Sequence, residues 1–311
     1  MENSFDTVAE SMIMKDGEGT DFRQEFYAYE QSLYLHRPLH FEDSFCNLID
    51  GMQSGTPFSF DNRLAFRPGE VTVLGGINGH GKSLFSGQIA LQLIANHQSV
   101  AIFSFEMLPA RTLFRMARQV IGHVPGKADK QKALEWLYSI NRNLILMDAQ
   151  GAVDAELILG ATLVSSRDHG CSVIIIDNLA KVVAGEDDFT GQKMFVQKLT
   201  DMARHLSVHI ILVHHVRKSG KESDGIDKFS FKGSGSIIDQ VDNAILIQRN
   251  LEKEAEAEDG KLNAAMDQDK ADVIVRVVKQ RNGDWTGKLG LWFEPISTTY
   301  CKSVTRTPLL R

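Results

Sequence analysis

The chain has 311 residues, of which 43% are hydrophobic and 24% charged, and its formal net charge is -6. This globular composition excludes a chain that is disordered throughout, and the acidic balance excludes a histone-like polybasic protein. A nucleic-acid binder is not excluded, because only the contact surface of such a protein has to be positive.

Cysteine content and hydropathy narrow the cellular setting. The three cysteines are far apart and odd in number, which excludes a disulfide framework and predicts a reducing cytoplasm. No apolar run approaches the ~18 residues of a membrane-spanning helix. The first residues also lack the basic and apolar regions of a signal peptide. We therefore expect a cytoplasmic protein without a membrane partner.

Residues 1–44 are predicted to form an N-terminal tail and arm. Residues 1–20 are polar and weakly patterned, which is typical of a flexible tail. A helix pattern then begins at Asp21 and ends before Pro38, with apolar side chains recurring every three or four positions. These side chains are Phe22, Phe26, Tyr29 and Leu33. The helix either folds back on its own core or docks on a neighbouring subunit, and both interpretations stay open.

Residues 45–311 are predicted to form one α/β domain with a mostly parallel central sheet. Short aliphatic runs typical of parallel strands buried on both faces lie at residues 71–75, 100–104, 144–148, 173–177 and 208–213. Helical patterns lie between them at residues 83–96, 109–122, 153–169 and 191–206. Antiparallel strands are expected at residues 243–249, 273–279 and 288–293. Residues 252–272 are acidic and poor in large apolar side chains, which predicts a solvated, mobile loop.

The strongest motif is GGINGHGKS, residues 75–83, which fits G-x-x-x-x-G-K-[ST]. A buried strand precedes it and an amphipathic helix follows, which a chance glycine-rich turn would lack. The glycines let backbone N–H groups face phosphate oxygens, and the helix N-terminus adds a positive dipole. Lys82 is expected to reach the β- and γ-phosphates of ATP, and Ser83 to bind Mg²⁺. The predicted nucleotide contacts are Gly76, Asn78, Gly79, His80, Gly81, Lys82, Ser83 and Leu84, with His80 a spacer whose side chain points away.

Two carboxylates follow predicted strands at the sheet edge where ligands bind in such folds. Asp177 ends the run VIIID and is expected to support the metal, although such an aspartate is also compatible with simple capping. Glu106 follows the strand VAIFSF, a position from which a carboxylate can activate the attacking water. Taken alone, Glu106 is also typical of a solvated loop.

Five segments, in order, resemble the ring-forming DnaB-type replicative helicases. They are VAIFSFEMLPARTLFRMARQVIG, VIIIDN, ILVHHVRK, FKGSGSIIDQVDNAILIQRN and VVKQRNGDWTGK, and the resemblance runs from about residue 45 to 300. The likeness is greatest to the helicase half of bacteriophage primase-helicases and mitochondrial Twinkle. It implies a RecA-like P-loop fold that hydrolyses ATP between the subunits of a hexameric ring and translocates on single-stranded DNA.

The resemblance also implies individual roles. Glu106 is the water-activating base, and His215 stands where the family has a residue that senses the γ-phosphate. Arg281 matches the arginine finger given to the neighbouring subunit's nucleotide, with Lys279 as its companion. Arg249 falls where some relatives contact the base. The predicted DNA contacts are the channel-loop residues Lys232, Gly233, Ser234 and Gly235, together with Arg217 and Lys218.

Plainer interpretations stand beside these roles. His215 is compatible with an ordinary strand end, and Lys279 and Arg281 with solvent-facing strand positions. Arg281 has no evident partner in the sequence, which favours a role in trans. Residues 216–236 carry five basic and three acidic side chains, a net charge of +2 that is compatible with a solvated surface. Their glycines let backbone N–H groups approach a phosphodiester chain, which favours single-stranded DNA.

The sequence thus predicts an ATP- and Mg²⁺-dependent DNA helicase that forms a homo-hexamer or a similar ring. Neither a primase domain nor a large helical N-terminal domain accompanies these motifs, so a separate primase or loader is expected as a partner. Two alternatives stay open. One is a RecA-type recombinase, which the KQRNG segment disfavours, and the other is a non-translocating ATP-dependent DNA-binding ring, which Glu106 disfavours.

Overall fold

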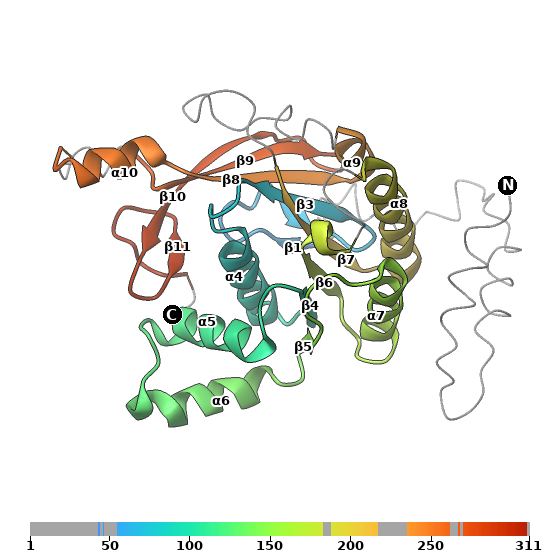
Figure 1. Cartoon of the computed structure of the whole chain (residues 1–311), viewed down its shortest axis with the longest axis horizontal. Helices are drawn as coiled ribbons and strands as arrows, with labels where there is room; N and C mark the ends of the chain where they lie inside the picture. The colour runs from blue at the N-terminus through green and yellow to red at the C-terminus, as the bar shows by residue number, and fades with distance from the viewer. Residues whose placement is uncertain are drawn as a thin grey trace, which may run out of the picture.

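The computed structural model describes residues 43, 46, 55–182, 188–216, 235–261, 267 and 270–309. Within these residues, nine strands form one sheet in the order β11-β10-β9-β8-β3-β7-β6-β4-β5, and β1 and β2 form a separate pair (Figure 1). The predicted arm lies outside the described residues, so its docking stays a prediction.

The elements have the following bounds. The strands are β1 Thr56–Pro57, β2 Ala65–Phe66, β3 Val71–Gly76, β4 Val100–Ser104, β5 Leu144–Met147, β6 Val173–Asp177, β7 His209–His215, β8 Asn243–Arg249, β9 Val273–Gln280, β10 Gly287–Glu294 and β11 Thr299–Cys301. The α-helices are α4 Lys82–Ala95, α5 Pro109–Ile121, α6 Lys130–Ile140, α7 Ala155–Arg167, α8 Phe189–Leu206, α9 Gly235–Gln240 and α10 Leu251–Glu258. None of these helices combines the length and apolar character that a membrane crossing needs.

The strand directions confirm the predicted sheet. Strands β5, β4, β6, β7, β3 and β8 pair in parallel, and β9, β10 and β11 continue the sheet in antiparallel fashion. In the central register, Val73 of β3 lies between Leu212 of β7 and Ala244 of β8. Because the central strands are parallel, their carboxyl ends meet at one edge of the sheet, where ligands bind in such folds.

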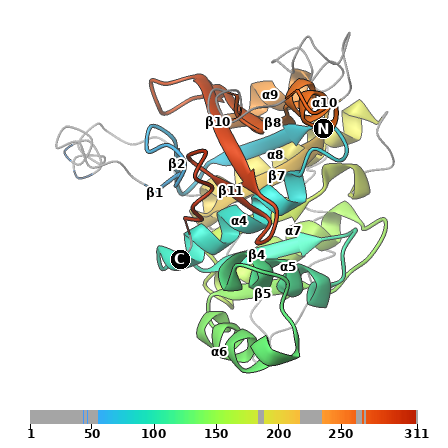
Figure 2. The ribbon, with the colours of Figure 1, turned by 90° about the vertical axis from the view of Figure 1, so that its left-hand side faces the viewer.

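Helices cover both faces of the sheet because successive strand side chains point to opposite sides. Val73 belongs to the apolar cluster that includes Leu159 of α7 and Val196 of α8. The next residue, Leu74, belongs to the cluster on the other face with Phe85 of α4 and Met116 of α5. Figure 1 shows α7 and α8 on one side of the sheet and α4 on the other, and Figure 2 shows β11 beside α4.

Residues 252–272 differ most from expectation. Their beginning forms α10, Leu251–Glu258, and Lys253 on this helix is only 3% exposed. Its ammonium lies 2.6 Å from a carboxylate oxygen of Asp267 and 2.6 Å from one of Asp272. A lysine is buried at acceptable cost only when its charge is paired in this way. The prediction of a solvated, mobile loop is therefore wrong for the part of the segment that the structure describes.

Candidate nucleotide site

The phosphate-binding motif joins the end of β3 to the start of α4. Gly79 and Gly81 have φ angles of +80° and +86°, in the left-handed region that favours glycine. At Gly76, an added Cβ would lie 2.7 Å from the carbonyl oxygen of Ile247, so the neighbouring strand leaves no room for a side chain. Three of the motif's glycines are thus required by backbone shape or by close packing.

Lys82 holds its charge inside this loop. The residue is 5% exposed, and its Nζ donates hydrogen bonds to the carbonyl oxygens of Gly76 at 2.8 Å and Ile77 at 2.9 Å. Burial lowers the pKa of Lys82 to about 8, while the nearby carboxylates of Asp177 and Glu106 oppose that shift. A partly desolvated ammonium gains strongly from an anion, so this arrangement favours phosphate in the adjoining cavity.

Asp177 and Ser83 bring two oxygen ligands together at the start of α4. Asp177 ends β6 and is 7% exposed. Burial raises the pKa of its carboxyl group, and a hydrogen bond from the Ser83 side chain opposes the rise. Such oxygen atoms suit Mg²⁺. The described residues contain no group of three or more His, Cys, Asp or Glu side chains that could hold a metal alone. The pair therefore fits a magnesium site that phosphate oxygens complete.

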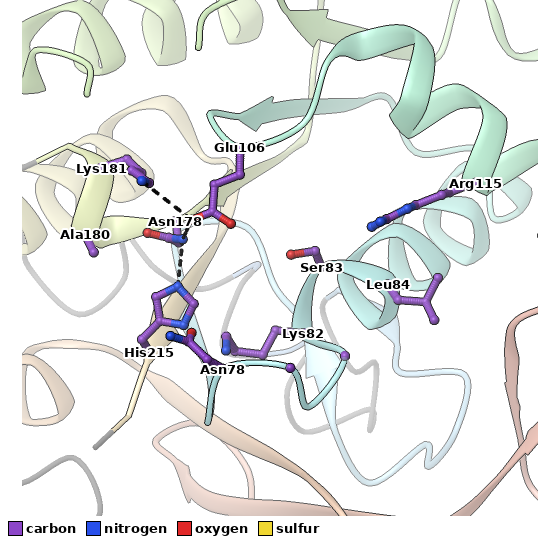
Figure 3. A pocket seen from close by; sticks show the side chains of 12 residues that line it. Asn78, Lys82, Ser83, Leu84, Glu106, Arg115, Asn178, Ala180, Lys181 and His215 are labelled. Atoms are coloured by element: carbon purple, nitrogen blue, oxygen red, sulfur yellow. Dashed lines mark hydrogen bonds and ion pairs between the residues drawn. The ribbon is translucent and has the colours of Figure 1, made fainter. Parts of the chain in front are cut away.

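Glu106, Asn178 and His215 form one chain of hydrogen bonds on the other side of the cavity from Ser83 (Figure 3). Asn178 Nδ2 donates to Glu106 Oε1 at 3.0 Å and to His215 Nε2 at 2.8 Å. Lys181 Nζ lies 3.9 Å from the same oxygen of Glu106, whose side chain is 50% exposed. One carboxylate oxygen is therefore held while the carboxylate as a whole stays accessible to water, as a general base requires.

The phosphate loop, the ends of β4, β6 and β7, and α5 surround a cavity of about 760 Å³. It brings together Lys82, Ser83, Glu106 and His215, all of which the sequence predicted as site residues. It is also lined by Arg115, Asn178 and Lys181, which sequence reasoning missed. All three lie in or beside the segments that carried the family resemblance, but nothing local shows that their side chains face the loop.

His80 and Arg249 connect the phosphate loop to the end of β8. His80 is 5% exposed, and its Nδ1 accepts a hydrogen bond from the backbone N of Arg249 at 3.1 Å. The prediction of a spacer that points away is therefore wrong, because this side chain joins two elements. The Arg249 guanidinium donates to both oxygens of Glu254, at 2.8 and 2.6 Å. Its contact with a base stays a prediction.

Lys279 and Arg281 lie near the opposite end of β8. In the β8–β9 ladder, Gln280 is the partner of Asn243, where β8 begins, whereas Arg249 ends the strand beside the phosphate loop. Six strand steps separate the two ends of β8, which spans 7 residues, so the ends are roughly 20 Å apart. Neither basic side chain lines the chain's own nucleotide cavity.

Both basic side chains are engaged within the chain. Arg281 Nη1 lies 3.1 Å from Oδ1 of Asp242, and the Arg281 side chain is 42% exposed. The expectation that Arg281 has no partner of its own is therefore wrong, although the side chain still reaches the surface. Lys279 Nζ donates to the carbonyl oxygens of Ile238 at 2.7 Å and Asp239 at 3.1 Å.

The predicted DNA loop falls largely outside the described residues. Gly235 is its one predicted contact with a described backbone, at the first position of α9. The others are outside, and their DNA contacts stay predictions; they are Arg217, Lys218, Lys232, Gly233 and Ser234.

A glycine-rich phosphate loop after a central strand, with two carboxylates at the same sheet edge, defines a P-loop nucleotide-binding protein. The profile of the DnaB-like helicase C-terminal domain matches residues 51–302. This match covers most of the sequence, and the chain belongs to that family.

Individual relatives agree with this assignment. A DNA helicase/primase of Enterobacteria phage T3 is 25% identical over 286 residues, which cover 83% of this chain and 47% of the relative. The chain thus spans about half the length of the curated relative.

Two solved structures share the fold. One is an isolated ATPase domain, which matches with a TM-score of 0.66 at 16% identity, over 84% of this chain and 98% of its own. The other is a DnaB-like replicative helicase, studied with its interactions with primase, which matches with a TM-score of 0.67 at 17% identity, over 96% of this chain and 74% of its own. The predicted RecA-like sheet with antiparallel C-terminal strands is confirmed.

Proposed function

We propose that the protein is the motor of an ATP-dependent replicative DNA helicase, which works as a ring on single-stranded DNA. The observation that carries the proposal is the convergence of Lys82, Ser83, Glu106 and His215 around one cavity of about 760 Å³. Membership of the DnaB-like helicase family supports a helicase in preference to other P-loop ATPases.

The site residues divide the work of phosphoryl transfer to water. Lys82 and the backbone N–H groups of the loop bind the β- and γ-phosphates, and Ser83 and Asp177 hold Mg²⁺, which neutralises developing phosphate charge. Glu106 accepts the proton of the attacking water through its accessible carboxylate. His215 lies at the same cavity, where it responds to the presence of the γ-phosphate.

Arg281 completes the site of a neighbouring subunit in this proposal. Its position roughly 20 Å along β8 from the chain's own phosphate loop prevents a role in cis. Its side chain is 42% exposed and is held by Asp242, so a charged group is available at the surface. Hydrolysis then depends on assembly, and changes at the subunit interface move the DNA loops.

The proposed partners are single-stranded DNA, further copies of the chain, and a separate primase or loader. The phage relative is named a helicase and primase, and this chain spans about half of it, so the remaining activity belongs to another segment or protein. The homo-hexamer is the ring that membership of the helicase family favours.

The test measures ATP turnover with and without single-stranded DNA, and displacement of a labelled strand. Lys82→Ala is expected to abolish both activities. Lys198→Ala is a matched control, because it removes a lysine paired with Glu156 away from the cavity. DNA-stimulated turnover without strand displacement would favour the non-translocating ring, whereas strand pairing by filaments would favour the recombinase. Wild-type turnover in Lys82→Ala would refute the phosphate role.

A further inference from the structure

Asn178 occupies a position that the helicase assignment by itself does not explain. It is 1% exposed, and it follows Asp177 at the end of β6. Its amide nitrogen is within hydrogen-bond distance of the proposed base and of the proposed γ-phosphate sensor, as Figure 3 shows: 3.0 Å from Glu106 Oε1 and 2.8 Å from His215 Nε2. One buried side chain thus connects the two residues on which hydrolysis depends.

The chemistry of the amide determines the direction of both bonds. An NH₂ group has two hydrogens and donates both, so Glu106 Oε1 and His215 Nε2 are the acceptors. Both donor hydrogens of Asn178 are therefore used. If His215 turns away to contact a ligand, one of the two bonds breaks, and Asn178 gains freedom to move with respect to Glu106.

His215 stands where the chain leaves the sheet toward the predicted DNA loop. It is the last residue of β7, and the backbone N of Val216 donates to the carbonyl oxygen of Gly76 at 3.2 Å. The predicted DNA contacts begin directly after Val216, at Arg217. A shift of this segment on DNA therefore acts on His215 first, and Asn178 is the next group in the hydrogen-bond chain.

We infer that Asn178 is a positioning residue that couples the general base Glu106 to the end of β7, so that DNA binding controls the rate of hydrolysis. The inference rests on the proposed function. Asn178 aligns Glu106 through one bond and reads the position of His215 through the other. Its loss leaves the half-exposed Glu106 carboxylate free to rotate and disconnects it from the DNA loop.

The experiment compares wild type, Asn178→Ala and Asn178→Asp, each titrated with ATP with and without an oligodeoxythymidylate strand. The aspartate has nearly the shape of asparagine but lacks both donor hydrogens, so it serves if the alanine variant fails to fold. Gln119→Ala is the control for loss of a buried amide, because Gln119 is 1% exposed and bonds to the Thr298 carbonyl away from the cavity.

We expect kcat with DNA to fall by about tenfold or more while KM for ATP stays within about twofold, since an interaction that acts only on the reacting state lowers kcat and leaves binding intact. The ratio of kcat with DNA to kcat without DNA should fall toward unity in both variants and stay unchanged in Gln119→Ala. Combining Asn178→Ala with His215→Ala should lower that ratio no further than His215→Ala alone, because the two residues act in one chain.

The outcomes separate the inference from the proposed function. Folded Asn178 variants with the wild-type ratio overturn the coupling role and leave the helicase proposal intact. A rise in KM with an unchanged ratio also overturns it, since that result describes a structural role. Wild-type protein whose turnover is indifferent to DNA overturns the proposed function, and the inference falls with it.

Discussion

Replacing Gly81 by alanine is expected to destabilise the protein through a contact with Tyr300. The φ angle of Gly81 is +86°, and the left-handed region costs an L-residue about 1–2 kcal/mol. An added Cβ would also overlap the Tyr300 hydroxyl, while Cζ of the same ring would stay at 3.5 Å, an ordinary contact. Tyr300 has little freedom to retreat, because its backbone N and O bond to the Gln88 side chain at 2.8 and 2.9 Å.

The two costs can be separated with Tyr300→Phe, which removes only the hydroxyl. Overpacking in a well-packed interior costs about 1–3 kcal/mol, so Gly81→Ala should lose about 2–5 kcal/mol once the backbone strain is added. Tyr300→Phe alone should cost less than about 1 kcal/mol, because its hydrogen bond to the Gly81 carbonyl is long, at 3.4 Å. The double variant should retain only the strain, about 1–2 kcal/mol.

The assay is denaturant unfolding followed by circular dichroism for wild type, both single variants and the double variant. The double variant should be more stable than Gly81→Ala, the reverse of additive behaviour. Gly79→Ala is the matched control, since Gly79 has a φ of +80° and nothing lies within 4 Å of its added Cβ. Tyr300→Phe should not rescue it. A double variant less stable than Gly81→Ala would refute the packing of β11 on the phosphate loop.

Three further predictions concern the reaction and its pH dependence. Glu106→Gln should bind nucleotide and assemble but hydrolyse about 10²–10⁴ times more slowly, and normal turnover in a steady-state assay would mean that another residue activates the water. Arg281→Ala should lower kcat by about 10³–10⁵, and mixing it with Lys82→Ala should restore some ATPase activity; co-assembly without activity would count against the trans role. The His209 ring bonds to Thr72 at 2.9 Å and to the Arg67 carbonyl at 2.8 Å, and burial lowers its pKa to about 4 from 6.5. Because the unfolded chain takes up this proton first, the free energy of unfolding should fall between pH 6.5 and 4. His209→Gln should flatten that dependence in unfolding measured across the range, and an unchanged slope would contradict it.

The phosphate loop and the sheet were predictable because their signals are local. All the groups that bind phosphate lie within the nine residues of GGINGHGKS, residues 75–83, so their spacing alone defines the site. The buried strands VTVLG and VIIID are continuous apolar runs, and chain order makes them parallel neighbours of other such runs. Glu106 and Asp177 follow because each ends a strand at the same edge of the sheet.

The remaining features depend on which distant segments meet, and only the tertiary structure decided them. Arg281 pairs with Asp242 across the start of β8, a contact between residues 39 positions apart that no periodicity encodes. Lys253 reads as part of a solvated acidic segment until Asp267 and Asp272 are brought around it. Asn178 follows a predicted metal ligand, yet its two acceptors lie on other strands, 72 and 37 positions away. Local spacing therefore determined the identity of the site, whereas the direction in which each buried polar side chain points depended on partners that folding alone brings within hydrogen-bond reach.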